Sequence, residues 1–173
     1  MEGGDAAGRP RDRERNEIDP LTCLGTRAAV LRALEHVGSG ETPPALLAVF
    51  SLDGFEEYEA LFGRLAGRTL LVKLAARLSE ALSPHGSCFR PRRDEFAALI
   101  ESTVEVAAPV LDAAVAGLGE RASSVAISAA WGAVALPSEA ADPRSALRVA
   151  DARLSANPAR RPRERRISPP RDT

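Results

Sequence analysis

The fold is decided by the stretch Phe89-Arg90-Pro91-Arg92-Arg93-Asp94-Glu95-Phe96, which leads directly into the apolar run Ala97-Ala98-Leu99-Ile100. Strand-like segments on both sides of a polar turn predict a hairpin around Arg92-Arg93-Asp94. Two acidic side chains at such a turn, Asp94 and Glu95, are able to bind a metal ion. However, two arginines precede them, at positions where a backbone that approaches a ligand closely uses glycine. The hairpin therefore resembles a catalytic turn that has lost some of the residues needed for catalysis.

Length and composition are those of a small soluble protein. The 173 residues favour one domain with tails, and the apolar fraction of 45% is ordinary for a globular chain. The net charge of −1 gives no overall field that would attract nucleic acid, so a nucleic-acid partner is not expected. No stretch approaches the roughly 20 apolar residues of a membrane span, so no membrane contact is expected. Cys23 and Cys88 fit neither a disulfide framework nor a zinc motif, which favours a reducing, cytoplasmic location.

Composition divides the chain into three parts. Residues 1–18 are charged and Gly-rich with almost no apolar side chains, which predicts a disordered leader. Residues 158–173 carry several arginines interrupted by prolines, which predicts a flexible basic tail. The folded domain is therefore expected over residues 19–157.

Within this domain, apolar periodicity and turn residues predict alternating helices and strands. In chain order these are a helix from Thr26 to Gly38, a buried strand over Ala45–Leu52, a polar segment over Asp53–Leu61, a helix over about 66–82, hairpin strands over Ser87–Pro91 and Glu95–Glu101, a helix over about 107–118, a strand over Ser123–Leu136 with a kink near Gly132, and a helix from Asp142-Pro143 through Leu154. Because helices alternate with strands while one strand pair is a hairpin, we predict an α/β fold with a central mixed β-sheet flanked by helices.

Five segments resemble the signature motifs of one known family. They are Asp19-Pro20-Leu21-Thr22-Cys23-Leu24-Gly25-Thr26-Arg27, Leu52-Asp53-Gly54-Phe55, Phe62-Gly63 with Gly67, Arg92–Phe96, and Ser128–Pro137. In this order and spacing they resemble the GGDEF domains, a family that includes diguanylate cyclases. The resemblance covers about residues 19–157 and implies a GGDEF-like domain, similar to nucleotidyl-cyclase and palm domains.

The resemblance implies a reaction and the groups that it needs. Diguanylate cyclases make cyclic di-GMP from two GTP molecules, one held by each protomer of a dimer, with magnesium bound by carboxylates. The family's first metal carboxylate falls at Ser51, whose neutral hydroxyl is a poorer ligand for a hard cation. Asp53 and Asp94 keep acidic positions and are vestigial metal candidates. From the residues alone, Asp53 is equally a turn residue ahead of Gly54, and Asp94 with Glu95 a solvated hairpin turn.

The family's two signature glycines fall at Arg92 and Arg93. In the family this backbone lies against the ribose and phosphates of GTP, so two long side chains would fill that space or change the turn type. An arginine pair can instead attract a phosphate. If the chain binds a nucleotide, the candidate residues are therefore Arg92, Arg93, Asp94 and Asp53, with magnesium as the cofactor. Otherwise no cofactor is expected.

Other functional positions of the family also differ in this chain. The guanine-reading Asn and Asp fall at Glu59 and Arg68, which present the wrong pattern of donors and acceptors to guanine. The phosphate-contacting Lys falls near Pro158, which has no side-chain donor. The inhibitory product site, written Arg-x-x-Asp, falls at Ser83 and Gly86, so binding of cyclic di-GMP there is not supported.

These losses lead to a functional hypothesis. We expect a degenerate GGDEF domain without enzymatic activity, in which Asp94 and Glu95 are vestigial, acting as a protein-interaction or regulatory module in bacterial cyclic di-GMP-related signalling. Its partner would be another protein or a second copy of the chain, and the hypothesis predicts an exposed apolar patch. The alternatives are a sensor that binds GTP or cyclic di-GMP without reacting it, and an active cyclase with a reorganised site.

Overall fold

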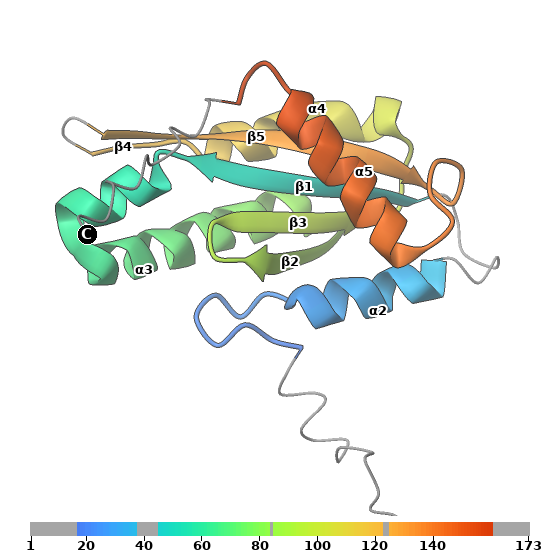
Figure 1. Ribbon diagram of the computed structural model, residues 1–173, viewed down its shortest axis with the longest axis horizontal. Coiled ribbons are helices and arrows are strands. Elements are labelled where there is room, and N and C mark those ends of the chain that lie inside the picture. Colours follow the sequence, from blue (N-terminus) through green and yellow to red (C-terminus); the bar gives the residue numbers. More distant parts are fainter. Residues whose placement is uncertain (1–16, 38–44, 84, 123–124, 161–173) are drawn as a thin grey trace, which may run out of the picture.

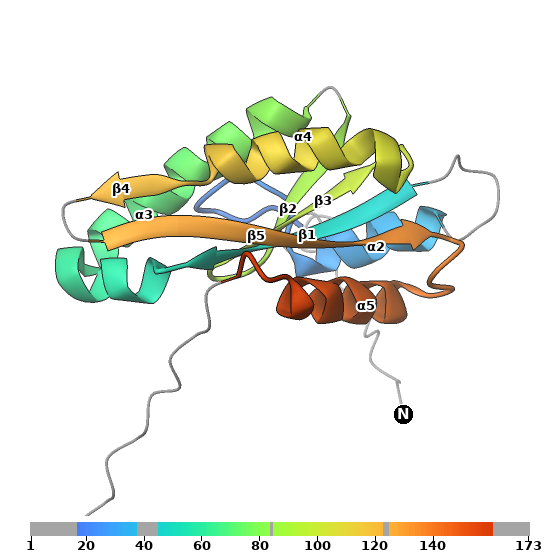
Figure 2. The same cartoon turned by 90° about the horizontal axis from the view of Figure 1, so that it is seen from above.

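The computed structural model describes residues 17–37, 45–83, 85–122 and 125–160. Its central feature is a five-stranded sheet in the order β2-β3-β1-β5-β4, with α3 and α4 on one face and α2 and α5 on the other (Figures 1 and 2). The elements are α2 (Arg27–Val37), β1 (Ala45–Asp53), α3 (Phe55–Leu82), β2 (Gly86–Arg92), β3 (Glu95–Ile100), α4 (Val104–Gly117), β4 (Glu120–Ala122), β5 (Val125–Leu136) and α5 (Pro143–Ala156). The predicted α/β fold with a helix-flanked central sheet is confirmed.

The direction of the strands corrects the prediction of a mixed sheet. Every pairing between the named strands is antiparallel. Helix α3 connects β1 to β2, which run in the same direction on either side of β3. Helix α4 connects β3 to β4, which run in opposite directions with β1 and β5 between them. In the described residues the parallel contact is an isolated bridge between Gly25 and Phe89. Alternation of helices and strands along the chain did not reveal which strands are neighbours.

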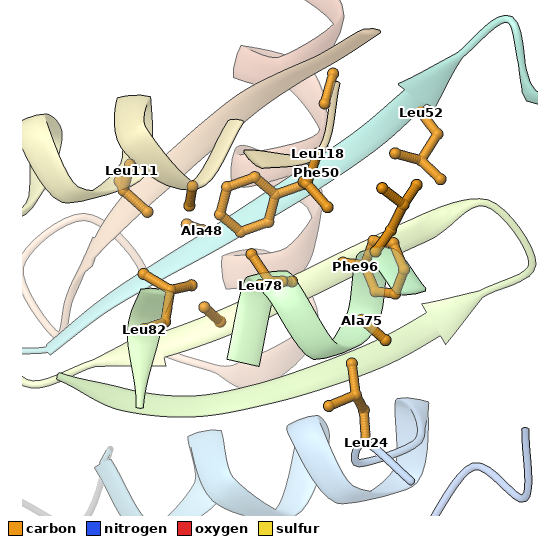
Figure 3. Packing of buried hydrophobic residues seen from close by; sticks show 14 of the residues in the cluster. Leu24, Ala48, Phe50, Leu52, Ala75, Leu78, Leu82, Phe96, Leu111 and Leu118 are labelled. Atoms are coloured by element: carbon orange, nitrogen blue, oxygen red, sulfur yellow. The ribbon is translucent and has the colours of Figure 1, made fainter. Parts of the chain in front are cut away.

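Strand β1 is the centre of the core because all nine of its residues are buried, as its apolar run predicts. Side chains alternate between the two faces of the sheet. Phe50 and its even-numbered neighbours pack against α3 and α4, where Leu78 and Leu111 meet them (Figure 3). Leu47 and Val49 point to the opposite face and pack against α2 and α5. The polar ends of β1 and β3 extend this second face beyond its apolar part.

Helix α3 begins much earlier than predicted. The segment Asp53–Leu61, expected to be a polar connection, is helical from Phe55, whose buried ring anchors the first turn. Glu56 and Glu57 lie in that turn, where their negative charges are stabilised by the positive end of the helix dipole. Gly63, with φ 86° and ψ 163°, breaks the helix into two arms. The apolar periodicity was clear only in the second arm, which explains the late predicted start.

The structure describes the chain between Glu17 and Arg160, with short gaps. The described chain begins at Glu17, whose carbonyl accepts a hydrogen bond from the Thr26 amide (2.7 Å), so residues 17 and 18 already belong to the fold. Residues 1–16 of the predicted leader and residues 161–173 of the predicted tail lie outside the described residues. Among the helices of the described ranges, none has the length and apolar character needed to cross a membrane.

Helix α5 lies directly on the sheet because of one glycine. A Cβ atom on Gly132 of β5 would collide with the backbone of Ala150 and Leu154 in α5. The strand passes Gly132 without interruption, so the predicted kink is absent and the glycine instead permits close packing. At its start the helix has a capping box, in which the Asp142 side chain accepts from the amides of Arg144 and Ser145.

The hairpin is confirmed, and one strand was missed. Strands β2 and β3 pair with Arg92 opposite Glu95, and Arg93-Asp94 forms the turn. Strand β4 was not predicted because three residues are too few to display an alternating pattern. Helix α4 begins at Val104, three residues before its predicted start.

Candidate functional site

The candidate site lies where the hairpin turn meets the end of β1. Glu95 of β3 pairs with Ser51 of β1, and the Leu52 amide donates to the Asp94 carbonyl at 3.0 Å. This contact holds the turn against the carboxyl end of β1. The sequence-predicted residues Arg92, Arg93, Asp94 and Asp53 are therefore brought to one end of the sheet.

Arg90 fixes the conformation of the turn. Its guanidinium donates twice to the Arg93 carbonyl, at 2.7 and 3.2 Å, and once to the Asp19 carboxylate at 2.9 Å. Asp19 also accepts from the amide and hydroxyl of Thr22, at 3.0 and 2.6 Å. Sequence reasoning missed this clamp. The sequence offered one signal for it, a pair of opposite charges. Asp19 stands at the start of the first motif, and Arg90 stands just before the hairpin motif.

The Asp19–Arg90 pair predicts a loss of stability in acid. Partial burial disfavours the charged carboxylate, but hydrogen bonds from Thr22 and Arg90 outweigh it and lower the pKa of Asp19 below 3.8. Because the folded-state pKa is the lower one, the stabilisation is complete above the unfolded-state pKa and is lost as the pH falls through the folded value. We expect Asp19→Asn to lower the free energy of unfolding by about 1–2 kcal/mol at pH 7.

This prediction is checked by urea unfolding of both proteins at pH 7 and at pH 3. The difference between wild type and Asp19→Asn should shrink at the lower pH, where the wild-type carboxyl is also becoming neutral. Glu80→Gln is the matched control, since Glu80 is exposed and forms no ion pair among the described residues. An equal difference at both pH values would contradict the electrostatic explanation.

Arg92 joins the hairpin to α5. Its guanidinium donates to both Glu95 carboxylate oxygens, at 3.0 and 2.8 Å, and to Asp151 of α5 at 3.4 Å. Desolvation opposes the charge, but the two carboxylates dominate and raise the pKa of Arg92. Glu95 is one of the few buried charged side chains of the described residues, so its negative charge is neutralised from within the protein. The partner Asp151 was not predicted as a site residue.

Arg93 reaches in the other direction, to α3. It forms an ion pair with Glu59 and places its guanidinium 5.9 Å from the centre of the Phe55 ring. The Glu59 side chain is only 10% exposed and lies against Gly67, where a Cβ would approach the carboxylate oxygen to 2.6 Å. The chain thus uses its own Arg93 to fill the space between the hairpin turn and α3. The sequence identifies Glu59 as a mismatched guanine-reading position, and the structure adds that Arg93 is its partner.

The residues at the end of β1 do not fit a magnesium ion. Ser51 is fully buried, and its hydroxyl has no hydrogen-bond partner among the described residues. Asp53, two residues further on the same face, is also buried. Across from Ser51, Glu95 is occupied by Arg92. Within the described ranges no group of three or more His, Cys, Asp or Glu side chains is arranged to hold a metal ion.

In the described residues, none of the remaining family positions forms an ion pair with this cluster. Arg68 is exposed on α3, and Pro158 is exposed in the turn after α5. Ser83 and Gly86 line a shallow groove. Among the described residues that line it, the charged one is Glu17. A Cβ on Gly86 would collide with the Leu99 carbonyl, so this glycine is required by the β2–β3 pairing. The described residues that line this groove therefore offer no basic side chain to a phosphate.

The match to a family model decides what kind of domain this is. A model described as "Diguanylate cyclase, GGDEF domain" matches residues 16–163. The chain belongs to the GGDEF domain family. This GGDEF domain is also similar to an uncharacterized 19.3 kDa protein in the repSA 5′ region of Streptomyces ambofaciens, with 37% identity over 82 residues. That match covers 47% of this chain and 44% of the relative, so less than half of the relative's length is spanned.

Solved structures share the fold of this GGDEF domain. The diguanylate cyclase SiaD of Pseudomonas aeruginosa, solved in complex with its activator SiaC, has a TM-score of 0.72 at 23% identity over 84% of this chain and 61% of its own. The FimX GGDEF domain of the same organism has a TM-score of 0.72 at 21% identity, covering 81% of this chain and 92% of its own. The GGDEF domain of DgcB from Caulobacter crescentus, solved with c-di-GMP, has a TM-score of 0.68 at 25% identity, covering 81% and 88%.

Proposed function

We propose that this GGDEF domain is catalytically inactive and acts as a protein-interaction module in cyclic di-GMP-related bacterial signalling. The observation that carries the proposal is a set of three internal ion pairs made by the two arginines of the hairpin. Arg92 is held by Glu95 and Asp151, and Arg93 is held by Glu59. Two carboxylates at family positions, Glu95 of the signature turn and Glu59 of the guanine-reading pair, are thus bound to arginines of the same domain.

Three separate requirements of phosphoryl transfer are affected. Metal binding loses a carboxylate at Ser51 and the free charge of Glu95. Base recognition loses its pattern because Glu59 pairs with Arg93 instead of facing solvent. Phosphate approach loses the open glycine backbone at the turn. Since removal of a single stabilising group commonly costs 2–4 kcal/mol of transition-state stabilisation, three losses together remove the activity.

The same contacts argue against the sensor alternative. A phosphate that binds Arg92 and Arg93 must compete with carboxylates that already pair with both guanidinium groups. Glu95 and Glu59 are largely buried, so releasing them would leave negative charges without a partner away from water. The arginines are therefore poor receptors for an additional anion.

An interaction role is supported by the apolar surface that the hypothesis requires. Leu61, Phe62 and Leu65 of α3 are 57%, 38% and 78% exposed. Large apolar side chains gathered on one surface commonly mark a contact with another protein. SiaD was solved with a protein activator, which makes a protein partner for this domain a reasonable proposal.

The proposal is tested by calorimetric titration with GTP and with cyclic di-GMP, each in magnesium, followed by a turnover assay on the same sample. We expect neither binding nor cyclic di-GMP formation. Binding without turnover would select the sensor instead. Turnover that disappears in Asp94→Ala would overturn the proposal and assign an active cyclase.

A further inference from the structure

The two arms of α3 meet in an exposed apolar corner. We call residues 61–65, which surround the break at Gly63, the α3 elbow. At the elbow the chain reverses at the outer end of the domain, away from the sheet (Figure 1). Leu65 is 78% exposed, and the rings of Phe62 and Tyr58 lie 4.8 Å apart. A Cβ placed on Gly63 would have no atom within 4 Å, so the elbow is open to an approaching surface.

The two arms carry opposite charges. Exposed Glu56 and Glu57 lie on the first arm, and exposed Arg64 and Arg68 lie on the second. Within the described residues none of these four side chains forms an ion pair, whereas Arg90, Arg92 and Arg93 all do. An apolar corner is thus flanked by unpaired acidic charges on one side and unpaired basic charges on the other.

We propose that the α3 elbow binds a second copy of this chain. In a two-fold symmetric contact the same surface is used by both copies, so that surface must be complementary to itself. A two-fold axis that bisects the elbow places the acidic arm of one copy over the basic arm of the other, twice. The apolar corner then covers its own symmetry mate. The proposal rests on the proposed function, for which it names the partner.

Charge distribution is what favours a second copy over an unrelated partner. An unrelated protein needs only a surface complementary to the elbow and places no constraint on the elbow itself. A two-fold contact requires a surface that is complementary to itself, and opposite charges on the two sides of an apolar centre meet this requirement. Because the contact involves a single helix, it is small compared with a standard interface of about 800 Å² per partner. We therefore expect a weak dimer, with a Kd on the order of 10–100 μM.

The test is sedimentation equilibrium of the full chain and of two charge-reversed variants. Glu56→Arg/Glu57→Arg and Arg64→Glu/Arg68→Glu each place like charges opposite one another in the dimer. Each variant alone should have a Kd at least tenfold higher than the wild type. An equimolar mixture of the two variants should recover association, because both pairs of arms are then complementary again.

Leu65→Ser is the apolar control, which should weaken association without any rescue by charge. Since all of these side chains are exposed, circular dichroism should show that each variant is folded at the temperature of the experiment, so lost association is not lost folding. Glu56→Arg/Glu57→Arg should melt somewhat below the wild type, because it removes the acidic residues from the first turn of α3. A wild type that is monomeric up to several hundred μM would overturn the proposal. So would variants that associate like the wild type, or a mixture that stays monomeric. None of these results bears on GTP turnover, so the catalytic part of the proposed function is tested separately.

Discussion

Gly132→Val is expected to lower the free energy of unfolding by at least about 3 kcal/mol. The new side chain would meet the backbone of Ala150 and Leu154 in α5. Backbone atoms of a helix cannot move aside as the end of a flexible side chain can. Helix α5 must therefore shift away from the sheet, which exposes Leu147 and the apolar residues beneath it.

Urea unfolding followed by circular dichroism measures this effect. Gly117→Ala is the matched control, because a Cβ on Gly117 has no atom within 4 Å and should change stability by less than about 1 kcal/mol. If Gly132→Val and the wild type have the same urea midpoint of unfolding, the close contact between α5 and β5 does not contribute to the stability of the fold. Asp151 would also move with α5, so the variant should release Arg92 from one of its two carboxylates.

Ser51→Asp/Arg92→Gly is expected to make the stability of the domain depend on magnesium. The substitutions add a carboxylate between Asp53 and Glu95 on one face of the sheet and remove the guanidinium that neutralises Glu95. Close carboxylates repel one another, so the variant should be less stable than the wild type without metal. Magnesium prefers such oxygen ligands and should restore part of the loss. A concentration one hundred times the Kd adds about 2.7 kcal/mol.

Thermal unfolding with and without magnesium reads this out directly. The control Ser51→Ala/Arg92→Gly removes the same arginine without adding a carboxylate and should not respond to magnesium. Wild type should not respond either. An equal magnesium response in the variant and its control would mean that Ser51 is not the position at which a metal ligand has been lost.

Most of the fold follows from local patterns in the sequence. The buried strand β1 could be predicted because a continuous apolar run of strand length has few other uses, and α5 because Asp142-Pro143 is a strong start signal. The strand directions could not be predicted, since apolar periodicity indicates which residues are buried but not which strands are neighbours. The first arm of α3 was missed because its exposed apolar residues do not form a one-sided stripe.

The hairpin was predicted from the sequence, but the contacts of its side chains were not. The hairpin and its arginines could be placed by order and spacing along the chain. Which carboxylate each arginine binds depends on the folded distance, as for Glu59, which lies 34 residues from Arg93 in the chain. The sequence also suggested that the arginines could attract phosphate, because an unpaired and a paired guanidinium look the same in a sequence.

The bridge made by Arg92 has a consequence for how the domain responds to the cell. A dissociable cation stabilises a protein by an amount that rises with its concentration. A guanidinium fixed to the backbone is present once in every molecule and cannot be diluted, chelated or outcompeted by a change in metabolite levels. We therefore expect the hairpin and α5 to keep one arrangement whether magnesium and GTP are scarce or abundant. Regulation of this domain would then come from its own abundance.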